Sequence, residues 1–188
     1  MTMERLTAEF FERNSVVGCA RGLIGAKFQW HGCEGRIVET EAYAAEGDEA
    51  CHTFFRPGAR AFVNSHPAGT AYVYLNYGVH WLFNVLVHGP QGSGFVLFRA
   101  LEPLSGIEQM MERRGKSKVR ELCSGPGKLT RAMGIDGAAH GCEFLGGEST
   151  GIFNGSAKRV TSSLRIGISR AQDLPWRFHE DANVHVSR

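Results

Sequence analysis

Three long apolar segments follow one another in the middle of the chain, and they constrain the fold more than any other feature. They cover residues 71–75, 79–87 and 94–101 and are rich in the branched and aromatic side chains that favour strands. Asn76-Tyr77-Gly78 joins the first two, and Gly89-Pro90-Gln91-Gly92 joins the last two. Connections this short link antiparallel neighbours. The middle of the chain therefore predicts an antiparallel sheet.

Other segments predict short helices and further strands around this sheet. The 188 residues, 43% of them hydrophobic, are enough for one substantial core, and no alternation of strand and helix indicates a parallel sheet. We therefore expect an α+β fold: a single mixed domain over residues 1–188, with a curved, mainly antiparallel sheet flanked by short helices. The expected helices are 7–11, 15–23, 104–113 and 127–133, and the further strands are 28–30, 36–43, 160–168 and 176–178. Residues 46–66, rich in small residues, glycine and proline, predict a long loop.

Composition excludes several classes of protein. No apolar run is long enough to span a membrane, and Met1-Thr2-Met3-Glu4-Arg5 lacks the order of a signal peptide, so a cytosolic protein is expected. The five cysteines are scattered without a Cys-x-x-Cys pair, which favours reduced thiols over disulfides. Cys51-His52 is adjacent rather than spaced like metal ligands, so no metal is expected. A net charge of +2 permits nucleic-acid binding without arguing for it.

Residues 35–43 place two carboxylates within a predicted strand. Strand alternation predicts that Ile37, Glu39, Glu41 and Tyr43 share one face. An acidic pair is costly to bury, and two close carboxylates push their pKa values apart, so that one acts as a base near neutral pH. The alternative is a strand face exposed to solvent.

Two polar residues interrupt the apolar strands. Asn84 lies in the segment 79–87, and Arg99 lies in the segment 94–101. A buried guanidinium has to be paired, and either Glu39 or Glu41 is an available partner in the same sheet. A structural ion pair for Arg99, and a backbone hydrogen bond for Asn84, are the simpler interpretations.

A large aromatic side chain sits where a hairpin turn usually carries small polar residues. Tyr77 lies between Asn76 and Gly78, and Tyr72 and Tyr74 share one face of the preceding strand. In nucleic-acid-binding proteins, such a side chain inserts as a wedge between base steps. The alternative is that these rings belong to the core.

Taken in order, these motifs resemble the alkyladenine (3-methyladenine) DNA glycosylase family, of the vertebrate type with bacterial members. The resemblance covers about residues 5–178. It rests on the following segments: Glu39-Thr40-Glu41-Ala42-Tyr43, Asp48-Glu49-Ala50-Cys51-His52, Tyr72-Val73-Tyr74, Tyr77-Gly78, Asn84, Arg99-Ala100-Leu101-Glu102-Pro103 and Glu121-Leu122-Cys123-Ser124-Gly125-Pro126.

The resemblance implies a catalytic pair. Glu41 matches the general base that deprotonates the water attacking C1′ of an extruded nucleotide. Arg99 matches the residue that positions Glu41 and the water. Glu39 has no chemical role in the family and is expected to be structural.

The resemblance also implies a pocket for the extruded base. Tyr43 matches the ring that stacks on one side of the base, and His52 and Tyr74 match the opposite wall. Asn84 matches the residue that disfavours guanine through its exocyclic amine. Tyr77 matches the side chain that fills the gap left in the duplex.

The sequence predicts the side chains that contact DNA phosphates less specifically than it predicts the pocket. Lys128, at a helix start, and Arg113, Arg114 and Lys116, in a basic run, are the predicted DNA-binding side chains, with a solvated basic face as the alternative. The segment 60–65 departs from the family's pattern in a loop near the expected pocket mouth, so lesion preference is less transferable than catalysis.

The resemblance predicts a monofunctional base-excision enzyme that acts on double-stranded DNA containing damaged purines. The expected substrates are 3-methyladenine, 7-methylguanine, hypoxanthine and ethenoadenine, and the product is an abasic site. No cofactor is expected. The protein is expected to be a monomer in the cytoplasm that acts at the bacterial nucleoid. Three alternatives stay open: a non-catalytic module that binds damaged DNA, a fold serving RNA or nucleotide chemistry, and a bifunctional lyase, which needs an amine nucleophile in the pocket.

Overall fold

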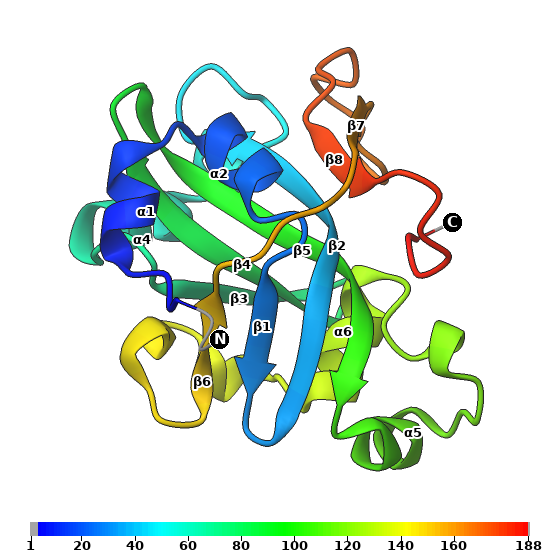
Figure 1. Ribbon diagram of the computed structural model, residues 1–188. Coiled ribbons are helices and arrows are strands. Elements are labelled where there is room, and N and C mark those ends of the chain that lie inside the picture. Colours follow the sequence, from blue (N-terminus) through cyan, green and yellow to red (C-terminus); the bar gives the residue numbers. More distant parts are fainter. Residues whose placement is uncertain (1–3, 188) are drawn as a thin grey trace.

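A computed structural model describes residues 4–187, and its centre is one eight-stranded sheet in the order β3-β4-β5-β2-β1-β6, with β8 pairing with β2 and β7 (Figure 1). Every pairing between these strands is antiparallel. The strands are β1 (Lys27–Trp30), β2 (Cys33–Ala44), β3 (Ala71–Asn76), β4 (His80–Gly89), β5 (Gly92–Ser105), β6 (Thr150–Phe153), β7 (Val160–Ser163) and β8 (Arg177–Glu180). The sheet confirms the α+β class and the three central strands.

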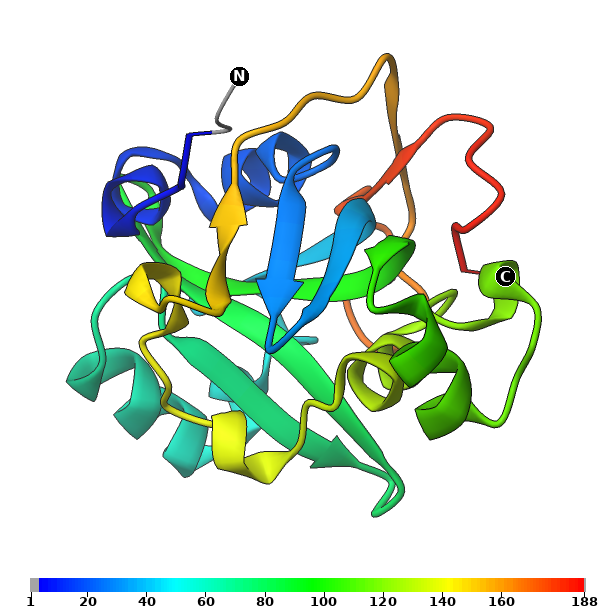
Figure 2. The same ribbon diagram turned by 60° about the horizontal axis from the view of Figure 1, so that its bottom comes forward.

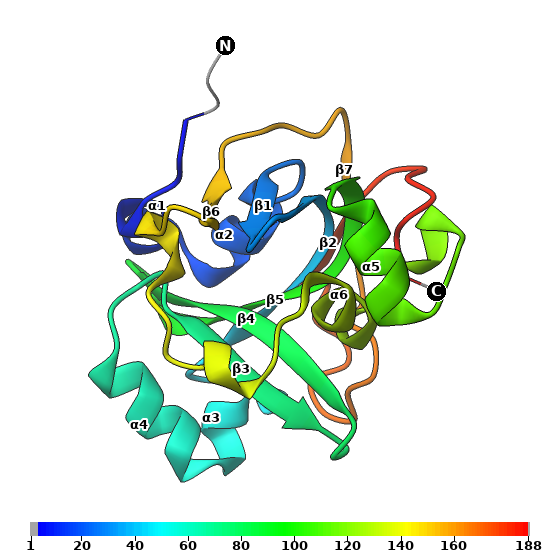
Figure 3. The same cartoon turned by 90° about the horizontal axis from the view of Figure 1, so that it is seen from below.

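Short helices cover both faces of the sheet. They are α1 (Ala8–Arg13), α2 (Val16–Gly22), α3 (His52–Phe55), α4 (Pro57–Ser65), α5 (Ile107–Arg114) and α6 (Pro126–Met133). Helices α1 and α2 lie on one face of β3, β4 and β5, and α3 and α4 lie on the other (Figure 3). Among the described residues, no helix is long and apolar enough to cross a membrane.

The prediction of a long loop over residues 46–66 was wrong. This segment contains α3 and α4, and Pro57 occupies the first turn of α4, where its missing N–H costs nothing. Phe62 and Val63 bury the apolar side of α4. The helix expected from residue 104 begins only at Ile107, because β5 continues to Ser105.

A local irregularity in β2 changes which side chains share a face. The pairing with β5 shifts between Ile37 and Glu39 and again between Glu39 and Thr40. Ile37 consequently packs into the main core together with Ala42, whereas Tyr43 packs against a second, smaller cluster. The expectation that Ile37 shares the face of the two glutamates was therefore wrong, because a bulge interrupts the alternation of a strand.

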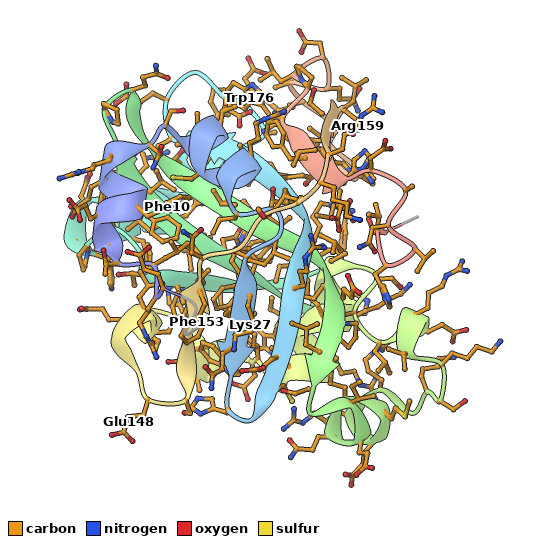
Figure 4. All side chains as sticks on the ribbon, viewed as in Figure 1. Phe10, Lys27, Glu148, Phe153, Arg159 and Trp176 are labelled. Carbon is orange, nitrogen blue, oxygen red and sulfur yellow. The ribbon has the colours of Figure 1, made fainter. Side chains whose placement is uncertain are left out.

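Two apolar clusters hold the sheet in place. The main core includes Phe28, whose ring centroid lies 5.2 Å from those of both Phe83 and Phe98. The smaller cluster contains Phe62 of α4 and Tyr72 of β3, with ring centroids 5.0 Å apart. At the sheet edge, the Lys27 ammonium of β1 lies over the Phe153 ring of β6 (Figure 4). The smaller cluster supports one side of the site described next.

Candidate active site

A pair of buried carboxylates occupies the middle of β2. Glu39 and Glu41 have no exposed surface. Arg99 of β5 lies between them, with its Nε 3.0 Å from Glu39 Oε1 and its Nη1 3.3 Å from Glu41 Oε2. The exposed-face alternative is thus excluded, and the arginine pairs with both glutamates rather than with one.

Glu39 is held as a carboxylate by several donors. Arg177 Nε donates to Oε1 at 2.6 Å, and the backbone N–H and hydroxyl of Ser187 donate at 2.7 and 2.8 Å. Burial alone would raise the pKa of Glu39, but Arg99 and these hydrogen bonds outweigh it, so its pKa lies below the usual range. All of these partners come from the protein itself, which agrees with a structural role.

Glu41 has a different environment. The Ile166 backbone N–H donates to Oε1 at 2.7 Å, and the Tyr43 hydroxyl donates to Oε2 at 2.7 Å. Burial raises the pKa of Glu41 above the usual range, and Arg99 and the two hydrogen bonds offset this only in part. The two glutamates therefore differ in proton affinity, and Glu41 is the better proton acceptor of the pair.

A cavity of about 700 Å³ opens beside these carboxylates. The structure brings most of the predicted site residues to its wall: Tyr43, His52, Tyr74, Tyr77, Asn84 and Arg99. Glu41 itself does not reach the surface of the cavity, but all three residues that donate to it, Tyr43, Arg99 and Ile166, line it. The carboxylate thus lies directly behind the cavity wall.

Aromatic rings form the wall contributed by α3 and β3. The rings of His52 and Tyr74 lie 4.2 Å apart, and His52 Nδ1 lies 3.0 Å from the Tyr72 hydroxyl. Burial, assisted by the Arg56 charge, lowers the pKa of His52 to about 4. The imidazole is therefore neutral at physiological pH.

Asn84 combines the two roles that the sequence left open. Its Nδ2 donates to the Tyr72 carbonyl at 3.1 Å, as a core asparagine would. The same residue also lines the cavity. Its amide is consequently fixed in orientation where a bound ligand would meet it.

The tip of the β3–β4 hairpin projects away from the rest of the molecule (Figure 2). Tyr77 is 86% exposed there, so its ring does not fold back onto the core. Both Tyr77 and Gly78 have positive φ, of 50° and 69°, as the two central residues of a tight hairpin turn require. A tyrosine is strained in this conformation, which points to a function for the exposed ring.

The predicted phosphate-binding residues have unequal surroundings. Lys128 is exposed in the first turn of α6, two residues after Pro126, which lines the cavity. Arg113 instead donates to the Ala132 carbonyl at 3.0 Å, and Lys116 lies 3.8 Å from Glu121. Arg114 donates to the Leu122 carbonyl at 3.1 Å. Of these four side chains, Lys128 is the one placed beside the cavity, and contacts from all of them to DNA stay predictions.

Sequence reasoning missed a second buried ion pair near the cavity. Arg165 and Asp48 have no exposed side-chain surface and form two hydrogen bonds, at 2.6 and 2.9 Å. Asp48 lies in a motif that supports the family resemblance, but nothing in the sequence marked Arg165 as its partner. Two exposed rings at the cavity mouth, Phe54 and Phe55, were also missed, because their segment was taken as a loop.

The cavity is lined by aromatic side chains and lies beside a buried ionisable carboxyl. Comparison with known proteins identifies the family. The methylpurine-DNA glycosylase family matches residues 9–184, so the chain belongs to that family. The resemblance found in the sequence is thereby confirmed.

Individual bacterial relatives cover nearly the whole chain. A protein of Chlorobaculum tepidum is 41% identical over 99% of this chain and 92% of its own length. A protein of Agrobacterium fabrum is 45% identical over 95% of this chain and 90% of its own. Both carry the name "Putative 3-methyladenine DNA glycosylase".

Proposed function

We propose that this protein removes alkylated or deaminated purines from double-stranded DNA by hydrolysing the N-glycosidic bond. The observation that carries the proposal is the position of Glu41, a buried carboxyl with a raised pKa whose donors Tyr43 and Arg99 line an aromatic cavity. A volume of about 700 Å³ lies in the usual range for pockets that enclose a small ligand. The target nucleotide has to leave the duplex to enter it, which costs least for a damaged or mispaired base.

The hairpin tip suits the step in which the nucleotide is extruded. Tyr77 is exposed, projects from the sheet and also lines the cavity mouth. Its ring would occupy the gap left in the base stack while the nucleotide turns into the cavity. The exposed Lys128 would contact the phosphate backbone beside it.

The cavity walls suit a flat base that carries positive charge. Tyr43 would stack on one side of the base, with His52 and Tyr74 on the other. Alkylation at N3 or N7 makes a purine cationic, and electron-rich rings attract cations. Because His52 is neutral, it adds no repulsion.

Hydrolysis requires a base, a water and a leaving group. Glu41 would accept a proton from the water, whose oxygen then bonds to C1′ as the bond from C1′ to the base nitrogen breaks. The bonding electrons leave with the purine, and the carboxylate stabilises the positive charge that develops on the sugar. Arg99 would hold Glu41 in place through Oε2, and the Ile166 N–H would hold it through Oε1.

A single-turnover excision assay tests this proposal. Duplexes carrying 3-methyladenine, 7-methylguanine, hypoxanthine or ethenoadenine are incubated with excess protein, and free base and abasic product are measured. We expect release of at least one base, and a loss of about 100-fold or more in Glu41→Gln. Glu46→Gln removes an exposed carboxylate just after the same strand and is the matched control.

Two results would contradict the proposal. Excision by Glu41→Gln at the wild-type rate would remove the base from the mechanism. Tight binding of damaged duplex without abasic product would favour the alternative of a non-catalytic binding module. A lyase is not favoured, because no lysine is among the described residues that line the cavity, and borohydride should trap no adduct.

A further inference from the structure

Arg165 is a buried cation for which the mechanism above has no role. Its side chain has no exposed surface, and its partner Asp48 has none either. Two of its hydrogen bonds go to the Asp48 carboxylate, and others go to the carbonyls of Ala42 at 2.9 Å and Ala171 at 3.1 Å. Burying a guanidinium this deeply is costly, and the carboxylate and the carbonyls that it meets compensate this cost.

These bonds join three segments that build the cavity. Ala42 lies in β2 between Glu41 and Tyr43, and Asp48 lies in the turn before α3, which carries His52. Asp48 in turn accepts hydrogen bonds from the backbone N–H groups of Ala44 and Ala50. Arg165 also directly precedes Ile166, whose N–H binds Glu41. The guanidinium therefore fixes the cavity wall that contains Tyr43 and the wall that contains His52 relative to the Glu41 carboxylate.

The guanidinium also lies over two aromatic rings. Its central carbon lies 4.7 Å from the ring centroid of Tyr43 and 5.4 Å from that of Trp176, the residue that precedes β8. Nε of Arg165 finds no hydrogen-bond acceptor among the described residues. Tyr43 lines the cavity and Arg165 does not. Because Arg165 lies over the Tyr43 ring without lining the cavity, a base stacked on the ring from the cavity would meet the face opposite to the guanidinium.

We propose that Arg165 positions Tyr43 and the Ile166 N–H around Glu41, and that its charge behind the Tyr43 ring sets how strongly the cavity prefers cationic over neutral purines. This inference rests on the proposed function of the cavity. A ring that already has a cation over one face attracts a second cation on its other face less strongly, because the first cation has drawn the electron density of the ring towards itself. Arg165 therefore weakens the stacking of a cationic base more than that of a neutral one, and Asp48 moderates this effect.

The test compares excision of a cationic base with excision of a neutral one. Single-turnover rates are measured on duplexes containing 7-methylguanine, which is cationic, and hypoxanthine, which is neutral. The rate for 7-methylguanine is divided by the rate for hypoxanthine in each variant. This ratio is then divided by the wild-type ratio, so that intrinsic differences between the two leaving groups cancel. General damage to the site lowers both rates and leaves the ratio unchanged.

Three variants give different expectations. The double variant Arg165→Met with Asp48→Asn removes both charges of the pair and keeps most of the volume, and we expect its ratio to rise about threefold or more. Arg165→Gln keeps a donor for Asp48 and should shift the ratio in the same direction, which covers the case in which the double variant does not fold. Arg165→Lys keeps the charge and should keep the ratio near the wild-type value.

The outcomes separate this inference from the proposed function. If the wild type excises both bases and neither uncharged variant changes the ratio, Arg165 is a structural residue only, and the inference is overturned while the function stands. A ratio that rises equally in Arg165→Lys would also overturn it, because the charge would then not be the cause. A wild type that excises no base would overturn the proposed function and this inference together.

Discussion

Changing each of the two buried glutamates to glutamine should affect a different property. Glu39→Gln should mainly lower stability, and Glu41→Gln should mainly lower activity. Glu39→Gln removes a carboxylate that accepts hydrogen bonds from Arg99, Arg177 and Ser187. Arg177 then loses its carboxylate partner, and Arg99 keeps the 3.3 Å bond to Glu41 and the 3.4 Å bond to the Ser187 hydroxyl. Breaking a buried ion pair from one side costs about 3–5 kcal/mol of the free energy of unfolding.

Glu41→Gln should cost much less. The amide oxygen still accepts the Ile166 N–H, and the amide NH2 can donate to the Tyr43 hydroxyl oxygen in place of the bond that this hydroxyl donated. The 3.3 Å bond from Arg99 is lost, while Arg99 keeps its shorter bond to Glu39. Because the folded state raises the pKa of Glu41, its ionised form lowers stability at neutral pH, and a neutral amide removes that penalty. We expect the free energy of unfolding to change by less than about 1 kcal/mol.

Urea unfolding at pH 7, followed by circular dichroism, and single-turnover excision of 7-methylguanine measure the two effects. Glu39→Gln should unfold at lower urea and retain part of its excision, whereas Glu41→Gln should be nearly as stable as the wild type without excision. Ser187→Ala is a graded control, because it removes one hydroxyl and keeps the N–H, and should cost about 1 kcal/mol. A Glu41→Gln variant that is destabilised as much as Glu39→Gln would contradict this expectation.

Three further predictions concern His52, Tyr77 and Lys128. The folded protein holds the pKa of His52 at about 4, below its ordinary value of 6.5, so stability should fall as the pH drops from 6.5 towards 4, because the unfolded chain takes up the proton first. Urea titrations over this range should show a shallower fall in His52→Asn, which retains the other histidines; an identical fall would contradict the assignment. Tyr77→Ser should weaken binding of a lesion duplex by roughly tenfold, by loss of the inserted ring, while its thermal unfolding stays near that of the wild type because the ring is exposed. Equal binding by both proteins would refute the wedge. Lys128→Ala should lower the salt dependence of duplex binding by about one ion, measured as the slope of log affinity against log salt, and Lys118→Ala, an exposed lysine paired with Glu121, should leave the slope unchanged.

Much of the fold was predictable because the strongest signals in the sequence are local. The segments 71–75, 79–87 and 94–101 are apolar, branched and closely linked, and each became a strand of the predicted antiparallel sheet. Residues 46–66 were mistaken for a loop because proline and glycine were taken as turn residues. Pro57 instead begins a helix, which a composition argument does not distinguish from a turn.

The candidate site was predictable where one element supplies its residues and less so where distant segments meet. Glu41 and Tyr43 lie two residues apart in β2, and the Arg99 pairing followed from the need to compensate a buried charge. The contacts of Glu41 with Ile166 and of Asp48 with Arg165 join residues 125 and 117 positions apart. No periodicity encodes such contacts, and the strand predicted over residues 160–168 ends at Ser163, so Arg165 and Ile166 lie in the segment after β7.

The bulge in β2 makes the length of this strand as important as its side chains. Ile37 and Ala42 face the main core, and Glu39 and Glu41 face Arg99, only because the register shifts between them. Deleting or inserting one residue between Ile37 and Glu39 would turn one half of the strand over, placing either a carboxylate in the core or an aliphatic side chain beside Arg99. Substitutions in this strand are therefore graded in effect, whereas a change of one residue in its length is all-or-none.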